Sequence, residues 1–419
     1  MQPQPGRPHR ILRSSKSLAL LASLLAVLAL SAISHARLLD PNDADHWPHV
    51  MRSATVPTAT MGTTFLNADD VGHHTYTPDG TEKTGIIYTC RGGHVDIAHL
   101  RKAADWTANI ASKAYDNIRN GYVQFSYKLY EPSVYQVTLA YPENWATMPR
   151  DERDRVAFEV ATALAQHCAY TSLTWHEVLT WFGYKTLYVL SEFESAFSWE
   201  DTFSNLLGTH LAVQALRDPD RSFDDAMTKL LNEEITMLGG QSARTARRAS
   251  NEVRGLWWSY NMIFLSMKKR NMDIGLDDGY VTPWLVPSIA QCPDAQPVSY
   301  PIPSLDCLDK YGFKMKLVIE MHEWEAPKVL KVVYPEGRKG RNTVVPAIHM
   351  PVIMDYIRKR AIKRWGPYFD NPRVKNTKSA TKLIGATNLG YAPSFRIEDV
   401  LPLTDWWLTD TPHNPDHVE

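Results

Sequence analysis

Residues 95–118, VDIAHLRKAADWTANIASKAYDNI, decide the fold of this chain. Apolar residues recur there every three or four positions, which is the spacing that gathers side chains on one face of an α-helix. The stretch therefore predicts a long helix with one buried face, carrying His99, Ala103, Trp106, Ile110 and Ala114.

Helical periodicity continues beyond this stretch. It predicts further helices over residues 151–182, from Ser198 onward, over 223–239 and over 243–269. Ser198 and Ser222 precede acidic residues at the spacing of a helix start, and Gly239-Gly240 is a stop signal. The sequence thus predicts a helical domain over residues 89–280.

The flanking regions have a different character. Residues 37–88 are rich in Pro, Thr, Gly and Asp, which predicts an irregular N-terminal arm, and residues 281–310 form a Pro-rich strap. For residues 311–419 we expect a small α+β region and tail, with a β-hairpin over 314–324 and 329–334 and a basic helix over 351–365. The predicted fold class is mainly α, α+β overall, with a helical domain and a smaller C-terminal appendage of β-hairpin plus helix.

The N-terminus has the features of a secretory signal peptide over residues 1–36. A basic segment precedes the apolar run from Leu18 to Ile33, and cleavage is expected after Ala36. We therefore expect an exported protein, periplasmic or extracellular; the alternative is an uncleaved anchor in the inner membrane. Export permits disulfides, and Cys292 and Cys307 bracket the strap, so we predict that they pair. The sequence leaves Cys90 and Cys168 open.

Composition excludes one class of partner. The 419 residues carry 45 Lys and Arg against 46 Asp and Glu, which leaves a formal net charge of -1. Nucleic-acid binding requires a basic face, so we expect no nucleic-acid partner. A cell-envelope component or a small-molecule ligand remains open.

The first group of candidate site residues lies at the start of the 95–118 helix. Asp96 and His99 are three residues apart on its apolar stripe, and a Gly-Gly turn could bring His94 beside them. This spacing suits a metal site. The alternative is that Asp96 caps the helix and His99 is a hydrogen-bonded core residue.

The second group lies on the next helix. His167 falls on its apolar stripe, and His176-Glu177 resembles the start of a zincin motif, in which a histidine binds zinc and a glutamate activates water. The second histidine of that motif is absent, because position 180 is a threonine. A packed helix with an ordinary polar pair is the alternative.

The third group surrounds the start of the helix near Ser198. Asp201, Asn205 and Gly208 share one face, whereas His210 lies on another. A glycine inside a helix suggests that something approaches closely. Glu200 has no role as clear as that of Asp201, which could pair with the Ser198 cap, so Glu200 is the stronger candidate for chemistry.

Together the three groups predict a shared polar pocket, because burying so many ionisable side chains is costly unless they pair, bind a metal or line a wet cleft. We expect a metal-dependent hydrolase that holds zinc, with Glu177 or Glu200 as the base. One alternative is a metal-free acid/base hydrolase that uses Glu177 and Glu200; another is a non-catalytic ligand-binding or structural protein. The expected metal ligands are His94, Asp96, His99 and His176, and the other pocket residues are His167, Asp201, Asn205 and His210.

The strings TCRGGHVDIAH (residues 89–99), WHE (175–177) and FSWEDTFSN (197–205) resemble a family of exported bacterial proteins classed as a domain of unknown function. The resemblance extends to about Ser304. It implies a location in the bacterial envelope and supports treating these strings as one unit, but it supplies neither a substrate nor a catalytic residue.

Overall fold

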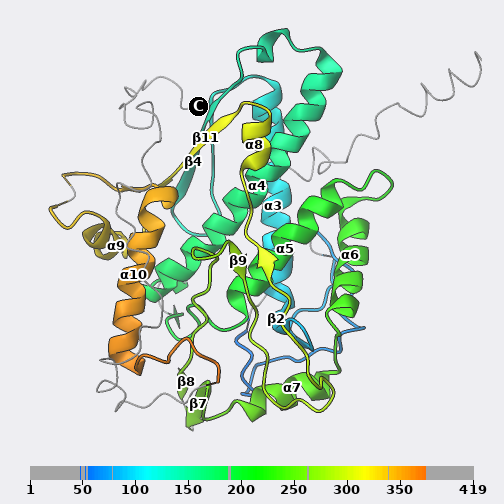
Figure 1. The fold of residues 1–419 in the computed structure, drawn as a ribbon, viewed down its shortest axis with the longest axis vertical. Helices are drawn as coiled ribbons and strands as arrows, with labels where there is room; N and C mark the ends of the chain where they lie inside the picture. The colour runs from blue at the N-terminus through cyan, green and yellow to red at the C-terminus, as the bar shows by residue number, and fades with distance from the viewer. Residues whose placement is uncertain are drawn as a thin grey trace, which may run out of the picture.

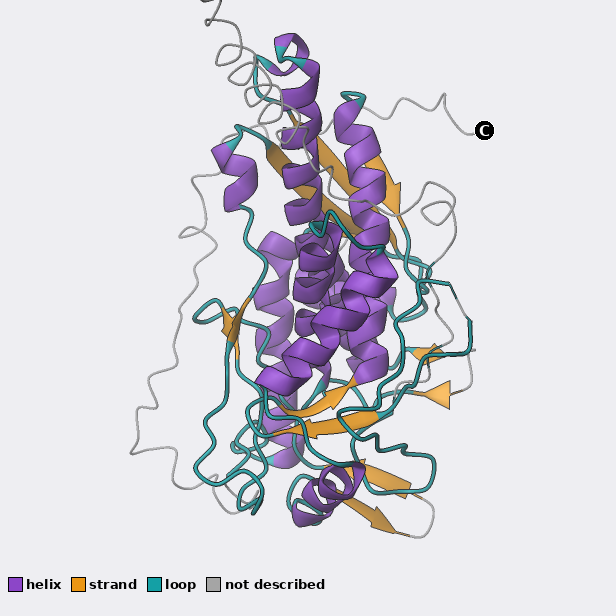
Figure 2. Cartoon of the chain, turned by 90° about the vertical axis from the view of Figure 1, so that its right-hand side faces the viewer, coloured by secondary structure: helices purple, strands orange, loops and turns teal. Residues whose placement is uncertain are grey.

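The structure is a computed structural model that describes residues 48, 52, 55–77, 79–186, 190–261, 264–337 and 339–373. Three helices, α3, α4 and α5, pack against one another in its centre (Figures 1 and 2). The helices are α3 (Ile97–Arg119), α4 (Arg150–Trp181), α5 (Asp201–Leu216), α6 (Phe223–Met237), α7 (Ala243–Glu252), α8 (Asp306–Lys310), α9 (Ala326–Val333) and α10 (Pro346–Trp365), with a 3-10 turn, η1 (Trp145–Thr147).

The strands are short and antiparallel. Four of them form one sheet in the order β12-β11-β4-β3, and the others form two-stranded pairs. They are β1 (Ile86–Thr89), β2 (Gly93–Asp96), β3 (Gln124–Tyr127), β4 (Val134–Ala140), β5 (Lys185–Thr186), β6 (Leu190–Ser191), β7 (Trp258–Asn261), β8 (Phe264–Met267), β9 (Tyr280–Val281), β10 (Tyr300–Pro301), β11 (Lys314–Glu320) and β12 (Thr343–Val344).

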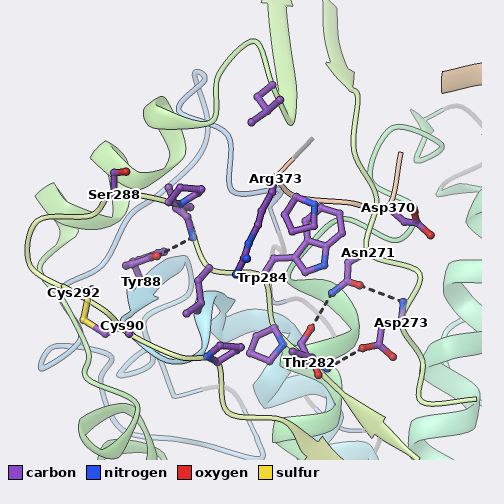
Figure 3. A pocket seen from close by; sticks show the side chains of 18 of the residues that line it. Tyr88, Cys90, Asn271, Asp273, Thr282, Trp284, Ser288, Cys292, Asp370 and Arg373 are labelled. Carbon is purple, nitrogen blue, oxygen red and sulfur yellow. Dashed lines mark hydrogen bonds between the residues drawn. A yellow bond between two sulfur atoms is a disulfide. The ribbon is translucent and has the colours of Figure 1, made fainter. Parts of the chain in front are cut away.

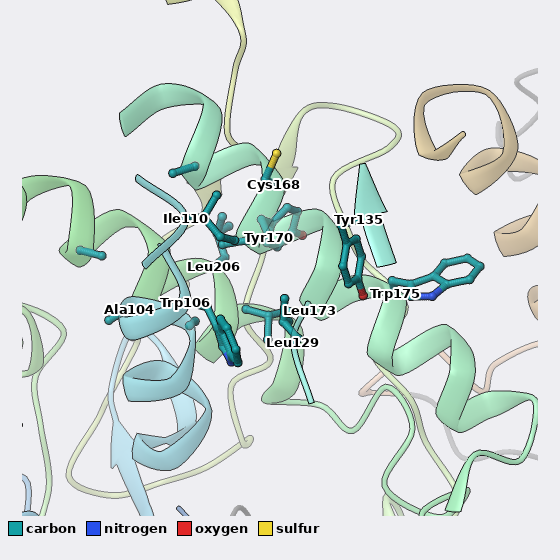
Figure 4. Close-up of a cluster of buried hydrophobic side chains, with 14 of the residues drawn as sticks. Ala104, Trp106, Ile110, Leu129, Tyr135, Cys168, Tyr170, Leu173, Trp175 and Leu206 are labelled. Carbon is teal, nitrogen blue, oxygen red and sulfur yellow. The ribbon is translucent and has the colours of Figure 1, made fainter. Parts of the chain in front are cut away.

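The core between the central helices explains why α3 and α4 are long. Trp106 and Ile110 of α3, Leu173 of α4 and Leu206 of α5 are buried in one apolar cluster (Figure 4). Gly208 lets α5 cross α3 at short range, because a Cβ there would lie 2.1 Å from the Leu100 carbonyl oxygen. The close approach predicted at this glycine is therefore that of a neighbouring helix.

The predicted fold class, α+β with helix dominant, is confirmed, and the four-stranded sheet adds a long-range connection. Strand β11, which follows the strap, pairs along its whole length with β4, from Lys314 opposite Ala140 to Glu320 opposite Val134. The region after the strap therefore shares a sheet with the first half of the chain.

Two predicted elements are wrong. The second strand of the predicted hairpin, residues 329–334, lies mostly in α9, where Pro327 occupies the first turn and Val329 and Leu330 are buried. The predicted helix over 243–269 ends at Glu252, and the aromatic-rich segment after it forms the β7–β8 pair. In both places the local apolar pattern fits helix and strand alike, and tertiary packing selects between them.

The predicted Cys292–Cys307 disulfide is also wrong. Cys292 is bonded to Cys90, at the turn between β1 and β2, with 5.1 Å between the Cα atoms. Cys307 is a free thiol on α8, whose sulfur lies 3.5 Å from the Glu159 carbonyl oxygen of α4. The two ends of the strap are therefore fastened to different elements. Cys168 is free and buried.

The predicted signal peptide, residues 1–36, lies outside the described residues, as does the start of the arm. Within the part of the chain that the structure describes, no helix is long and apolar enough to cross a membrane.

Candidate functional site

Five of the predicted site residues gather where the N-termini of α3 and α5 meet the C-terminal part of α4. We call this group the acid/base cluster; it consists of Asp96, His99, Glu177, Glu200 and Asp201. All of its carboxylate side chains are buried, and His99 is 17% exposed at its side chain, so the imidazole is the part that reaches solvent.

His99 lies between two carboxylates. Its Nδ1 atom is 3.2 Å from Asp96 Oδ2 and 3.3 Å from Asp201 Oδ1. Burial alone would lower the pKa of His99, but the two carboxylates outweigh that effect and raise it. The two carboxylates therefore favour the charged form of the imidazole.

Backbone groups fix the two aspartates. Asp96 Oδ1 accepts from the Ala98 amide and so caps α3, as the alternative interpretation of the sequence had it, while Oδ2 accepts from the Thr55 amide of the arm. Asp201 Oδ2 accepts from the Ser198 amide at 2.9 Å. Helix α5 begins at Asp201 rather than Ser198, so the capping contact spans the turn before the helix.

Glu177 is held by a strained backbone. Its Oε2 atom accepts from the Phe197 amide at 2.7 Å, and Phe197 is in the left-handed region with φ of 53°. A bulky residue adopts that conformation only when its surroundings enforce it, and such strain is found most often at functional sites. Burial and the nearby charge of Asp201 raise the pKa of Glu177 to about 7.

Glu200 is fully buried. Its Oε1 atom accepts from the Ser198 hydroxyl at 2.6 Å, whereas Oε2 has no hydrogen-bond partner among the described residues. Burial, and Asp201 next to it, raise the pKa of Glu200 well above its usual value. Burial and the neighbouring carboxylate therefore favour the protonated, neutral form of Glu200.

His176 belongs to a neighbouring pair that the sequence did not reveal. Its Nδ1 atom lies 2.5 Å from Glu131 Oε1, and its Nε2 atom lies 3.7 Å from Glu192 Oε2. Burial opposes protonation, but Glu131 outweighs it and raises the pKa of His176 to about 9. Tyr130 packs edge-on against the imidazole. Glu131 lies in the loop between β3 and β4, where no periodicity marked it.

Three predicted residues lie elsewhere. His94 accepts a hydrogen bond at Nδ1 from Trp199 and lies 3.3 Å from the Ala246 carbonyl through Nε2, and burial lowers its pKa to about 4. His167 and His210 contact the carbonyl oxygens of Pro303 and Pro301 and so hold the strap. These histidines serve packing.

Asn205 lies one turn after Asp201 on α5. It is buried, and its Oδ1 atom has no hydrogen-bond partner in the described part of the chain. Among the described residues, no side-chain hydrogen bond or ion pair joins Asn205 to the acid/base cluster.

The four expected zinc ligands do not fit a common metal ion as they stand. Asp96 uses both oxygens on backbone amides, His176 Nδ1 faces Glu131, and His94 lies in a separate aromatic cluster. Among the residues that the structure describes, no group of three or more His, Cys, Asp or Glu side chains is arranged to hold a metal.

A solvent-open cleft of about 800 Å³ lies beside the Cys90–Cys292 disulfide (Figure 3). Polar groups of the cleft bond to neighbouring segments of the chain. Asp273 Oδ2 accepts from the Thr282 backbone amide, and the Asn271 backbone amide donates to the Phe197 carbonyl oxygen. None of its lining residues belongs to the acid/base cluster. The cluster, with its shifted pKa values, is therefore the stronger candidate for chemistry.

Comparison with known proteins identifies the family. No curated protein and no solved structure matches the chain. The family model described as "Protein of unknown function (DUF4056)" matches residues 48–273, which is more than half of the chain and contains the whole acid/base cluster. The match ends before Ser304, where the sequence resemblance was expected to end. The chain therefore belongs to the DUF4056 family of proteins of unknown function.

Proposed function

We propose that this protein is a hydrolase that works by acid/base catalysis at the acid/base cluster, with Glu177 as the proton-transferring group. The observation that carries the proposal is the position of His99 between Asp96 and Asp201. Glu177 lies close enough for the charges of His99 and Asp201 to shift its pKa. This arrangement holds a charged imidazole next to a carboxyl group that can give or take a proton.

The charge balance of the cluster supports a catalytic role. Four buried carboxyl groups share one imidazole, and Arg270 and Lys102 supply further positive charge nearby. Burying carboxylates in excess of their partners costs stability, so a protein that needed only a stable core would gain from apolar residues here. Perturbed carboxyl groups of this kind concentrate at functional sites.

Each residue then has a role that follows from its surroundings. With a pKa of about 7, Glu177 can take a proton from an attacking water and return it to the leaving group. Glu200, whose neutral form is favoured by burial, can in that form donate a hydrogen bond to a substrate oxygen through Oε2. His99 carries positive charge at the opening of the cluster, where it can stabilise a developing oxyanion.

Turnover by the purified protein tests the proposal. A panel of chromogenic esters, amides, glycosides and phosphate esters should reveal one hydrolysed class, and Glu177→Gln should reduce that rate by about 10²–10⁴-fold with the fold retained. Glu233→Gln is the matched control, because Glu233 is an exposed helix glutamate paired with Lys229.

Two outcomes would overturn the proposal. No turnover of any class would favour a non-catalytic, ligand-binding protein. Stoichiometric zinc that is lost in His99→Ala, together with activity that a chelator abolishes, would favour the metal-dependent hydrolase expected from the sequence.

We also propose that the protein is exported. The basic segment and apolar run of residues 1–36 support this, and so does the Cys90–Cys292 disulfide, since such bonds persist in oxidising compartments. Intact-mass measurement of protein recovered from its host should find a chain that starts at Arg37. A species that retains residues 18–33 would indicate an anchor instead.

A further inference from the structure

A hollow of about 510 Å³ lies between the end of α4 and the helices α9 and α10, and none of its lining residues belongs to the acid/base cluster. Helices α9 and α10 lie side by side in Figure 1. We call this hollow the basic groove. Its volume falls within the range of small-molecule sites.

Five cations line the basic groove, and no acidic residue does. Lys328 and Lys331 come from α9, whereas Arg360, Lys363 and Arg364 come from α10. Like charges that converge from two helices repel one another, so the arrangement costs stability while no anion is bound. Such a feature is explained by a ligand that carries negative charge.

The cations at the centre of the groove are not neutralised by the protein. Lys331, Arg360 and Lys363 have no carboxylate within 4 Å among the described residues, and Arg364 has only a long contact of 3.7 Å to Glu194. Lys359 of the same helix does not line the groove, and it pairs with Asp355 at 2.6 Å. On α10, Lys359 is therefore neutralised by a carboxylate, whereas Arg360 and Lys363, which line the groove, have no carboxylate partner among the described residues.

Aromatic rings form the floor of the groove. Phe182 stacks on Tyr356 with 5.8 Å between ring centroids, and Trp181 packs against Phe193. These rings are buried or half-buried within the hollow and do not protrude, unlike the apolar side chains that anchor a protein in a membrane surface. Arg360 lies over the Tyr356 ring at 5.9 Å and Arg364 over the Phe193 ring at 4.5 Å, so flat guanidinium groups cover part of this floor. Planar cations beside aromatic rings suit a flat group that carries phosphates.

We propose that the basic groove binds a soluble small molecule with two or more phosphate groups attached to a planar ring system. The lysines and arginines contact the phosphates, and the ring system packs against the aromatic floor beside Tyr356 and the flat guanidinium groups of Arg360 and Arg364. The concave shape favours a small soluble ligand over a lipid surface, because the cations of α9 and those of α10 line one hollow of about 510 Å³.

Calorimetric titration of the full chain with ADP tests this proposal, with pyrophosphate and adenosine as partial ligands. We expect one ADP per chain, bound more tightly than either partial ligand. The double variant Arg360→Ala/Lys363→Ala should weaken ADP binding by about tenfold or more, since each lost charged hydrogen bond contributes on this scale. Lys359→Ala is the control and should bind as the wild type does.

A third variant separates the two halves of the ligand. Tyr356→Leu should weaken ADP binding but leave pyrophosphate binding unchanged, with the melting temperature of each variant checked so that misfolding is recognised. Sedimentation with phosphatidylglycerol vesicles examines the other source of phosphate.

The proposal is overturned if neither ADP nor pyrophosphate binds at concentrations up to about 1 mM. It is also overturned if pyrophosphate binds as tightly as ADP, because the ring system would then contribute nothing to the affinity. Vesicle binding that depends on Arg360 and Lys363 without ADP binding would assign the groove to a membrane surface.

Discussion

Helix α3 carries two buried polar regions that differ in how their charges are compensated. The first is the acid/base cluster at its N-terminus. The second, which we call the arm network, lies about two turns further on and joins α3 to the N-terminal arm; it consists of Arg52, His74, Glu82, Arg101 and Asp105.

The arm network is balanced. Arg52 contacts Asp105 at 2.5 Å and Glu82 at 2.6 Å, and Arg101 contacts Glu82 at 3.3 Å, so two cations face two carboxyl groups. Burial outweighs the effect of Arg52 on Asp105 and raises the pKa of that carboxyl group to about 7. Although burial alone would lower the pKa of Arg52, the two carboxylates outweigh it and raise it. Burial and the two arginines lower the pKa of His74 well below its usual value, so that residue is neutral.

The comparison shows how buried charges that stabilise the fold differ from buried charges that are candidates for catalysis. A balanced network with each ion facing its opposite stabilises one arrangement of the chain, here the arm on α3. In the acid/base cluster the carboxyl groups outnumber the imidazole that they share, and this surplus is what the proposed acid/base function would explain. Variants in the two regions should therefore behave differently.

The largest effect is expected in the arm network. Asp105→Asn removes one anion and leaves Arg52 undercompensated in a buried site, so the free energy of unfolding should fall by about 3–5 kcal/mol. Urea denaturation at pH 7 measures it. Asp70→Asn is the control, because the Asp70–Lys83 pair is exposed and should contribute no more than about 1 kcal/mol. Equal effects of the two variants would break the comparison.

The next effect is a pH dependence from Glu177. Its pKa is raised on folding to about 7, so between pH 4.5 and 7 the folded state binds more protons than the unfolded state. The free energy of unfolding should then fall as the pH rises through this window, by about 2 kcal/mol for this group. Denaturation of Glu177→Gln across the same range should show a smaller fall, whereas parallel curves would contradict the raised pKa.

His176 should act in a higher pH window. Its pKa is raised on folding from 6.5 to about 9, so the stabilisation by Glu131 is fully present below pH 6.5 and is lost as the pH rises through 9. The pair reaches solvent at the imidazole, so we expect about 1–2 kcal/mol. His176→Gln should flatten the stability curve between pH 6.5 and 9, and an unchanged slope would show that the pair is not ionised.

The smallest effect is expected for Glu200→Gln. Because the raised pKa favours the neutral form of Glu200, the variant exchanges a carboxylic acid for an amide of the same shape and hydrogen-bonding capacity. The free energy of unfolding should change by less than about 1 kcal/mol. A loss of about 3 kcal/mol or more would mean that an ionised Glu200 holds the fold, and would make the acid/base cluster resemble the arm network.

The sequence predicted those parts of the site that lie within single helices. Asp96 and His99 are neighbours because three residues make nearly one helical turn, and the 95–118 stripe placed α3 almost to the residue. His94 could not be placed in this way. Residues 93–96 form a strand, in which positions two apart are separated by roughly 6–7 Å, and the ring of His94 faces Trp199.

The site residues that the sequence did not predict lie in segments without helical or strand periodicity. Glu131 comes from a loop, and Arg52, His74 and Glu82 come from an arm whose composition predicted only irregular structure. Their partners on α3 and α4 are distant in the sequence, so only the folded chain reveals the pairing. The disulfide prediction was wrong for the same reason. It paired Cys292 with the nearest cysteine in the sequence, whereas the true partner is 202 residues away.

The bond between Cys90 and Cys292 also decides what happens when the chain is cut. The two cysteines are 202 residues apart, so α3 to α7 all lie inside one covalently closed loop. A protease that cleaves once within this loop opens a ring and releases no fragment. Nicked protein should therefore migrate as a single species on a gel without reductant and separate into two pieces only after the disulfide is reduced.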